Sequence, residues 1–314
     1  MSFMNTTKVP DWAAGLMSSG YDIMVAGIEA DLTKRGLPFE WQGDSVEVSV
    51  PEHGKIKIGT SDLVRAMIHG APEQWRDIIS THMTTIDATL LIIADDTTLD
   101  RVRPNLRIAI VSERQHVDGA VDRVAAPGLR MAVVIDQPKT IITVTHDMIN
   151  KWGASSDELF GIAIPNTEAM PMMAEVREIN GVRIEVVHND TCYAAAMGIL
   201  SLPKLVTNAK LGALVGIPDR DNVAFHQVVD VRSIAASQII VAMTVSTFVR
   251  SPYAMSETPY WWHNGVFEQF ARVPVEDNFA LIPPRGLLTI LGVSDMSPVN
   301  MMAPKAPGAG KLIN

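Results

Sequence analysis

The chain has 314 residues, of which 47% are hydrophobic and 19% are charged, and its formal net charge is -9 at pH 7. Apolar material is sufficient for a packed core, and the composition argues against bulk disorder. No cluster of Lys and Arg interrupts the acidic balance, so we expect no nucleic-acid partner and no docking to an anionic membrane. The single cysteine, Cys192, excludes an internal disulfide and a cysteine-rich metal site, which fits a reducing cytoplasm.

No targeting or membrane segment is expected. The N-terminal residues lack the basic stretch and long apolar core of a signal peptide. The most apolar segment, residues 234–249, is interrupted by polar residues such as Gln238 and is too short to span a bilayer without distortion. We interpret it as a buried helix. The sequence therefore predicts a cytoplasmic protein that does not insert into a membrane.

The first hundred residues predict a region of helix, hairpin and helix. Helical spacing of apolar residues over 16–34 ends at Gly36. Three short β runs with tight turns between them follow, at residues 39–41, 46–50 and 56–58. Ser61 and Asp62 can cap a short helix, and Pro72 opens a longer one that extends to about Ile86.

The middle of the chain predicts buried strands and two capped helices. The strands are residues 107–111, 131–135 and 140–144, and a polar loop covers 112–128 between the first two. Thr145 caps a helical turn over 147–152, and Ser155 or Ser156 opens a helix over 157–164.

The last part of the chain predicts three further hairpins with helices after the first two. The hairpin strands are residues 172–179 with 182–187, 212–217 with 223–228, and 259–263 with 266–270. Asn180-Gly181 and Asn264-Gly265 are strong signals for two-residue turns. Asp190 or Thr191 caps a helix over 192–201, and Asp230 caps one over 232–250.

These elements predict an α+β fold in which antiparallel hairpins alternate with helices. Each strand pair is joined by a turn too short for a parallel crossover. A hairpin–helix unit recurs near 39–86, 131–164, 172–201 and 211–250, and an origin by duplication is a hypothesis. We expect an N-terminal region over 1–100, a core region over 101–275 and a C-terminal extension over 276–314.

The extension contains a last apolar run over 287–293 and then a segment rich in Pro, Gly, Ala and Met. Such a segment cannot bury a face of its own. Two interpretations stay open: an unstructured tail, or an arm that docks on a neighbouring subunit through apolar anchors that include Met301 and Met302.

Few residues are candidates for chemistry, and we predict no catalytic residue, metal site or cofactor. His188 and Cys192 have the types of a thiol nucleophile and its base, but adjacency in sequence is not the geometry of a triad. We favour a strand-to-helix cap as the explanation of the segment, and a speculative binding site remains at Asn189, Asp190 and Asp221. The eight histidines show no i, i+4 spacing typical of a zinc site.

Other motifs have simpler explanations. Ser201 and Lys204 match an S-x-x-K string, but Ser201 lies at a predicted helix end and Pro203 should block helical continuation. Asp95-Asp96 is best interpreted as a solvated linker. In the aromatic strand, alternation places Trp261 and Trp262 on opposite faces. One indole is therefore expected in the core, and the other is a candidate for a surface or an interface.

Several segments resemble the YtpQ-like family, whose members share a domain of unknown function. They are KTIITVTHDMINKWGASSDELFGIAIPN with Trp152 and Asn166, the pair Asn189-Asp190 followed by Tyr193, GALVGIPDRDNVAFHQVVD with Asp221, and PYAMSETPYWWHNGVFEQF. The resemblance covers roughly residues 12–270 and excludes the tail. It implies a fold and no reaction, because the family has no established activity.

Two functional interpretations follow. The first is a non-catalytic cytosolic binding or scaffold protein that acts through a protein partner or self-association. The sequence identifies no small-molecule ligand. The alternative is a hydrolase or transferase with a cleft around His188, Asp190 and Asp221. It requires these groups to converge and line a pocket.

Overall fold

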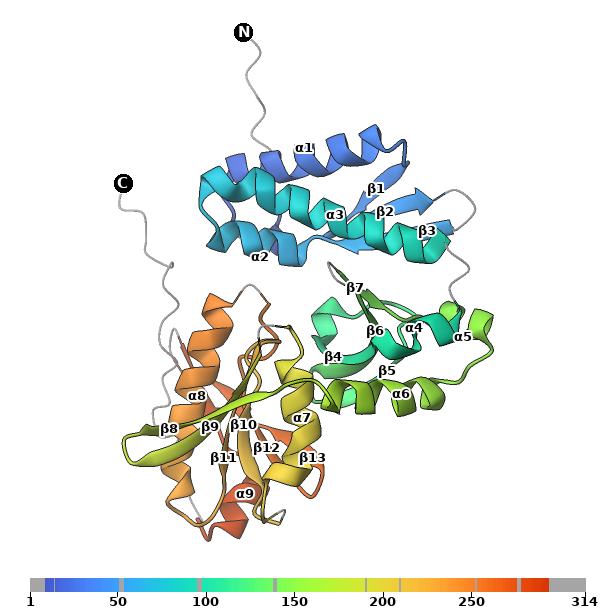
Figure 1. Cartoon of the computed structure of the whole chain (residues 1–314). Helices are drawn as coiled ribbons and strands as arrows, with labels where there is room; N and C mark the ends of the chain where they lie inside the picture. The colour runs from blue at the N-terminus through green and yellow to red at the C-terminus, as the bar shows by residue number, and fades with distance from the viewer. Residues whose placement is uncertain are drawn as a thin grey trace, which may run out of the picture. The chain divides into compact units, whose positions relative to one another are not determined.

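The computed structural model describes residues 9–13, 15–50, 54–94, 98–137, 140–189, 191–208, 210–251, 253–275 and 278–293. The predicted α+β class is confirmed, because helices alternate with antiparallel hairpins throughout (Figure 1). The chain divides into two compact units. The first comprises Met1–Val102 with Asp136–Ile142, and the second comprises Arg103–Ile135 with Thr143–Asn314.

The first unit packs helices against one face of a three-stranded antiparallel sheet of order β1-β2-β3. Its elements are η1 (Asp11–Ala13), α1 (Ser18–Lys34), β1 (Phe39–Gln42), β2 (Ser45–Val50), β3 (Gly54–Gly59), α2 (Ser61–His69), η2 (Pro72–Gln74), α3 (Trp75–Ala94) and α4 (Leu99–Val102). The longer helix thus passes the predicted end at Ile86. On α1, Met24, Ile28 and Leu32 recur every four residues and enter the core.

The second unit begins with a four-stranded sheet of order β4-β6-β5, with β7 paired to β6, although the end of β6 and most of β7 are counted with the first unit. Its elements are η3 (Arg103–Asn105), β4 (Leu106–Ser112), η4 (Glu113–Gln115), β5 (Asp122–Ala126), β6 (Leu129–Gln137), β7 (Thr140–Thr143), α5 (His146–Trp152) and α6 (Ser156–Glu168). The caps predicted at Thr145 and Ser155 are confirmed, since their hydroxyls accept hydrogen bonds from Met148 N and Glu158 N.

The loop predicted over residues 112–128 is wrong in part, because β5 lies within it. The prediction failed because Asp122 breaks the apolar pattern expected of a strand. Its carboxylate is nevertheless buried, with 4% of the side chain exposed, since Arg130 on β6 and His116 pair with it. A charged residue can occupy a buried strand position when opposite charges accompany it.

The rest of the second unit contains a six-stranded antiparallel sheet of order β13-β12-β10-β11-β9-β8 and a separate antiparallel pair, β14-β15. Its elements are β8 (Met173–Ile179), β9 (Val182–His188), α7 (Ala194–Leu205), β10 (Ala213–Gly216), β11 (Asn222–Gln227), α8 (Ser233–Arg250), β12 (Tyr260–His263), β13 (Val266–Gln269), β14 (Ala271–Val275), β15 (Asn278–Ile282) and α9 (Arg285–Ile290). The three predicted hairpins are all present, and Asn180 and Asn264 adopt the positive φ that their two-residue turns require.

Helices cover both faces of this sheet. On one face Gly198 of α7 lies against Val223, and a Cβ at Gly198 would be 2.9 Å from that side chain. On the other face Gly216 lies against α8, where a Cβ would be 2.1 Å from Thr244 Oγ1. The two glycines therefore allow each helix to approach the strands closely.

The two-sided cover changes the expectation for the indoles. Trp261 and Trp262 do lie on opposite faces, but both are buried, with 1% and 4% of their surfaces exposed. Neither is the surface or interface residue that the sequence allowed for. Trp261 donates from Nε1 to Leu211 O over 2.8 Å and packs in one cluster with Leu281 and Leu287.

Those two leucines belong to the expected C-terminal extension. The apolar run over 287–293, which the sequence left without a partner, begins within α9 and contributes to the core around Trp261. The anchors Met301 and Met302 lie outside the described residues.

α8 is long and apolar enough to cross a membrane by length and composition, and 39% of that window is buried within the protein. Its buried face includes Ala236, Ile240 and Val241 and packs on β10 and β11. A core helix that covers one face of a sheet has the same length, apolar composition and packing.

Candidate functional site

Three loops meet at one end of the six-stranded sheet, and they bring together two of the predicted site residues. Asn189 N donates to Asp221 O over 3.3 Å, at the point where β9 ends beside the start of β11. Asp190, the third member of the set, lies outside the described residues. His188 pairs in register with Asn222 on the neighbouring strand.

The Asn189 side chain is buried, and its hydrogen bonds connect three segments. Its amide nitrogen donates to Pro171 O over 2.9 Å, and its Oδ1 accepts from Thr191 N over 2.6 Å. The same nitrogen lies 3.6 Å from Met197 Sδ on α7. Asn189 therefore fixes the entry to β8 and the approach to α7, which is a structural role.

The helix after this loop begins later than predicted. α7 starts at Ala194 after Tyr193, which makes no side-chain cap, and Cys192 takes a left-handed φ of 62° before it. Thr191 bonds to Asn189 and does not cap the helix. The predicted cap by Thr191 and the helix start at Cys192 are wrong, because the turn around Asn189 takes up these residues.

Asp219 is the central acceptor of the second loop, and the sequence analysis did not select it. Its Oδ1 accepts from Asp221 N and from Asn222 Nδ2, each over 3.0 Å, and 4% of the residue is exposed. The signal was an Asp directly after Pro218, a combination that favours turns closed by a side-chain oxygen.

The neighbouring Arg220 lies with its guanidinium 3.2 Å from the ring centroid of Tyr253. Its carbonyl accepts from Ala195 N at the start of α7. The third loop joins at Met255, whose N–H donates to Pro218 O over 2.7 Å. These polar groups bind one another and the backbone, so the arrangement holds loops together.

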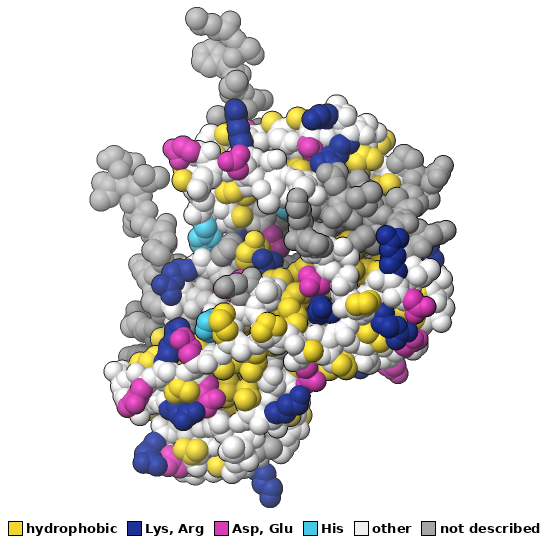
Figure 2. Space-filling model, viewed as in Figure 1, with side chains coloured by type: hydrophobic (Ala, Val, Ile, Leu, Met, Phe, Trp, Pro, Cys, Tyr) yellow, Lys and Arg dark blue, Asp and Glu magenta, His cyan; other side chains and the backbone are white. Residues whose placement is uncertain are grey.

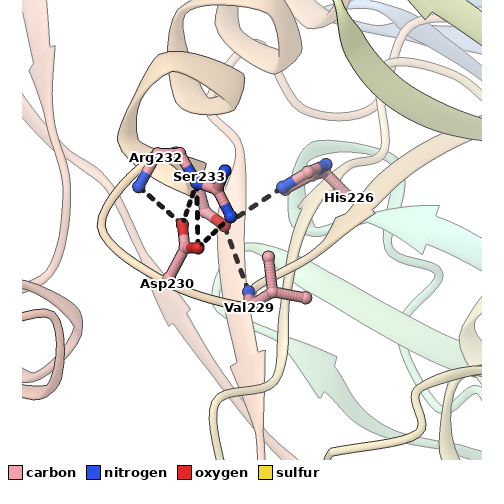
Figure 3. A network of polar contacts seen from close by, with 5 residues as sticks. All are labelled: His226, Val229, Asp230, Arg232 and Ser233. Carbon is pink, nitrogen blue, oxygen red and sulfur yellow. Dashed lines mark hydrogen bonds and ion pairs between the residues drawn. The ribbon is translucent and has the colours of Figure 1, made fainter.

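A second polar network lies where β11 leads into α8 (Figure 3). The Ser233 hydroxyl accepts from Val229 N over 3.1 Å and lies 3.2 Å from His226 Nε2, while His226 Nδ1 lies 2.8 Å from Arg183 O. Serine, histidine and a carbonyl in line are the parts of a nucleophile and its base. Here, however, Ser233 is buried, with 3% exposed, and fixes the turn before the helix.

Asp230 does not cap α8 as predicted. The helix begins at Ser233, and its N-cap Arg232 makes no side-chain cap. Asp230 Oδ1 accepts from Arg232 N over 2.8 Å, and the carboxylate also pairs with the guanidinium of Arg232 (Figure 3). This pairing lowers the pKa of Asp230, the hydrogen bond from the Arg232 side chain contributing most.

The S-x-x-K string lies in the last turns of α7. Pro203 is inside that helix, so the expectation that it blocks continuation at Ser201 is wrong. Lys204 Nζ lies 2.7 Å from Glu168 Oε1 on α6, an ion pair at the surface. Within the described ranges, no three His, Cys, Asp or Glu side chains gather in a way that could hold a metal ion.

One exposed feature of this unit is the outer strand β8. It pairs with β9 and forms one edge of the six-stranded sheet, at the end of the strand order (Figure 1). Met173 and Val176 are 47% and 56% exposed. Glu175 stands between them, and in Figure 2 apolar and charged side chains lie next to one another over the region of the β8–β9 hairpin.

The opposite edge of the sheet differs. β13 has four residues, and it contacts β5 of the same unit. β8 has seven residues, and its strand partner in the described chain is β9. The sequence predicted β8 as a strand but not as an edge, because strand order depends on how hairpins associate.

Comparisons of the chain with models of known protein families, with curated proteins and with solved structures find no match.

Proposed function

We propose that this chain is a non-catalytic binding or scaffold protein that acts through protein–protein association, and that β8 is the strand it offers to a partner. The supporting observation is a seven-residue outer strand with two large apolar side chains more than two-fifths exposed. Long edge strands present a row of backbone donors and acceptors to another chain. The proposal includes a cytoplasmic location and no nucleic-acid, membrane or cofactor requirement.

The hairpin geometry identifies the free backbone groups. Asn180 and Gly181 form a two-residue turn with φ of 52° and 76°, so the flanking pair Ile179 and Val182 exchange hydrogen bonds. Hydrogen-bonded and non-bonded pairs then alternate along the strands. The N–H and C=O groups of Ala174, Val176 and Glu178 therefore point away from β9.

Other polar groups of the second unit support a binding role over a catalytic one. The Asn189 and Asp219 side chains are committed to backbone donors, and the Ser233 hydroxyl is buried in a turn. A catalytic group needs contact with a substrate in a hollow. The resemblance to the YtpQ-like family supplies no activity and is compatible with this proposal.

A photo-crosslinking experiment tests it. The photoreactive residue p-benzoylphenylalanine replaces Val176 in one variant and Val266 on the opposite edge strand in the control. The two valines are 56% and 55% exposed, so accessibility is matched. We expect protein crosslinks from position 176 in living cells and few from 266. Equal crosslinking from both, or none from 176, contradicts the proposal.

A further inference from the structure

We infer that the partner of β8 is a second copy of the same strand, so that two chains join antiparallel about Val176 in a two-fold dimer. The inference rests on the proposed function, in which β8 associates with another polypeptide. The supporting observation is the sequence of the strand, Met-Ala-Glu-Val-Arg-Glu-Ile over residues 173–179. When two copies run antiparallel with Val176 at the centre, residues of opposite charge face each other and apolar residues face each other.

The backbone fits this pairing. With Val176 opposite its counterpart, Ala174 of one copy lies opposite Glu178 of the other. These are the three residues whose N–H and C=O groups point away from β9. Each pair would exchange two hydrogen bonds, so the whole outer row is satisfied. The two six-stranded sheets would then continue into one.

The side chains fit as well. Residues directly opposite each other in an antiparallel pair lie on the same face. Glu175 of one copy therefore faces Arg177 of the other, twice in the dimer because of the symmetry. In the single chain Arg177 already pairs with Glu175 of its own strand, and both are exposed. Met173 faces Ile179 at each end, and the Val176 side chains meet in the middle.

Neighbouring registers are disfavoured by charge. A register shifted by two residues toward the N-terminus of β8 puts Glu175 of one copy opposite Glu175 of the other. The opposite move puts Arg177 opposite Arg177. Like charges directly opposite destabilise a strand pair. The charges therefore select one register and also discourage unspecific edge pairing.

A charge-reversal series tests the inference in the full chain, by light scattering coupled to size-exclusion chromatography over a range of concentrations. We expect the native chain to form a dimer. R177E and E175R each replace two attractive pairs with two repulsive ones, and dimerisation should weaken by about tenfold or more. The double variant E175R/R177E restores opposite charges and should restore the dimer. Circular dichroism confirms that each variant is folded.

A cysteine crosslink tests the register. In a Cys192→Ser background, Val176→Cys places two thiols opposite each other at a backbone separation of about 5.5 Å, within reach of a disulfide. We expect a covalent dimer on mild oxidation, and none from the matched control Val266→Cys.

The outcomes separate this inference from the proposed function. A native chain that stays monomeric at every concentration, or a dimer unaffected by R177E, overturns pairing between copies of β8. If Val176 then crosslinks to a different protein in cells, the proposed function stands. If neither a dimer nor a crosslink from Val176 forms, both are wrong.

Discussion

The hydroxyl of Tyr260 donates a hydrogen bond of 2.9 Å to Pro127 O, across 133 positions of sequence. Tyr260 lies on β12 of the six-stranded sheet, and Pro127 lies in the turn between β5 and β6. The hydroxyl also lies 3.0 Å from Ser256 Oγ. The contact therefore connects the four-stranded and six-stranded sheets through a fully buried side chain.

Replacing Tyr260 with Phe keeps the ring and removes this bond. The free energy of unfolding should fall by about 1–2 kcal/mol, because Pro127 O loses a buried donor. Urea denaturation at neutral pH measures the change. A loss below about 0.3 kcal/mol would show that the contact contributes little to the joint between the sheets.

Tyr260 also predicts a dependence on alkaline pH. Burial raises the pKa of its hydroxyl to about 12, above its ordinary value of 10.0. The neutral side chain is thus favoured in the folded state, and its stabilisation is complete below pH 10 and lost as pH rises toward 12. Stability measured between pH 9 and 11, kept below the folded pKa, should decline less in Y260F than in the native chain.

Asp122 predicts a dependence on acidic pH. Burial acts to raise the pKa of its carboxyl, but the hydrogen bond and charge of Arg130, together with His116, outweigh it and lower the pKa. The carboxylate therefore stabilises the fold above its unfolded pKa of about 3.9, and this contribution is lost as pH falls below that value. We expect D122N to cost about 2–3 kcal/mol at pH 7. Near pH 3 the difference from the native chain should shrink, and a constant difference contradicts the assignment.

Gly216 tests the close packing of α8 on the sheet. An added Cβ would meet Thr244 Oγ1 at 2.1 Å, so G216A should lower the free energy of unfolding by about 1–3 kcal/mol. Because T244A removes that atom, the double variant should show a favourable coupling, measured by a double-mutant cycle. Gly161 is the matched control. It lies inside α6 with no atom within 4 Å of an added Cβ, and G161A should stabilise by about 0.5–1 kcal/mol.

Truncation distinguishes β8 from the C-terminal segment as the source of assembly. A chain that ends at Ser294 keeps β8 and α9 intact. If β8 pairs with its copy, the truncated chain should dimerise as the full chain does, by light scattering. Conversion of a dimer to a monomer on truncation would favour the docking arm that the sequence left open.

Hairpins and their turns were predictable because local chemistry specifies them. Asn180-Gly181 and Asn264-Gly265 supply consecutive positive φ angles, and the flanking residues form the expected strands. Helix starts were predictable where a hydroxyl caps a helix directly, at Thr145 and Ser155. They failed at Thr191 and Asp230, where turns before the helix use the polar groups.

Features that depend on distant partners were not predictable. Asp122 is a strand residue because Arg130 and His116 neutralise it. Trp262 is buried on the face where Tyr260 reaches Pro127 of the four-stranded sheet, and the sequence alone does not show that packing. Asn189 N does donate a hydrogen bond to Asp221 O. The sequence did not show that this contact, together with the Asn189 side chain, holds loops in place. The edge position of β8 was not predictable because it depends on the order in which the hairpins associate into the sheet.

The packing of Leu281 and Leu287 over Trp261 has a consequence for synthesis on the ribosome. Most strands of the second unit form local hairpins, which can close soon after they emerge. α8 packs on the face of the sheet that carries Trp261, but the cover over this indole is completed only when β15 and α9 have been made, near the end of the described chain. Nascent chains that stall before residue 280 would lack Leu281 and Leu287, leave this indole partly exposed and become substrates for chaperones or proteases.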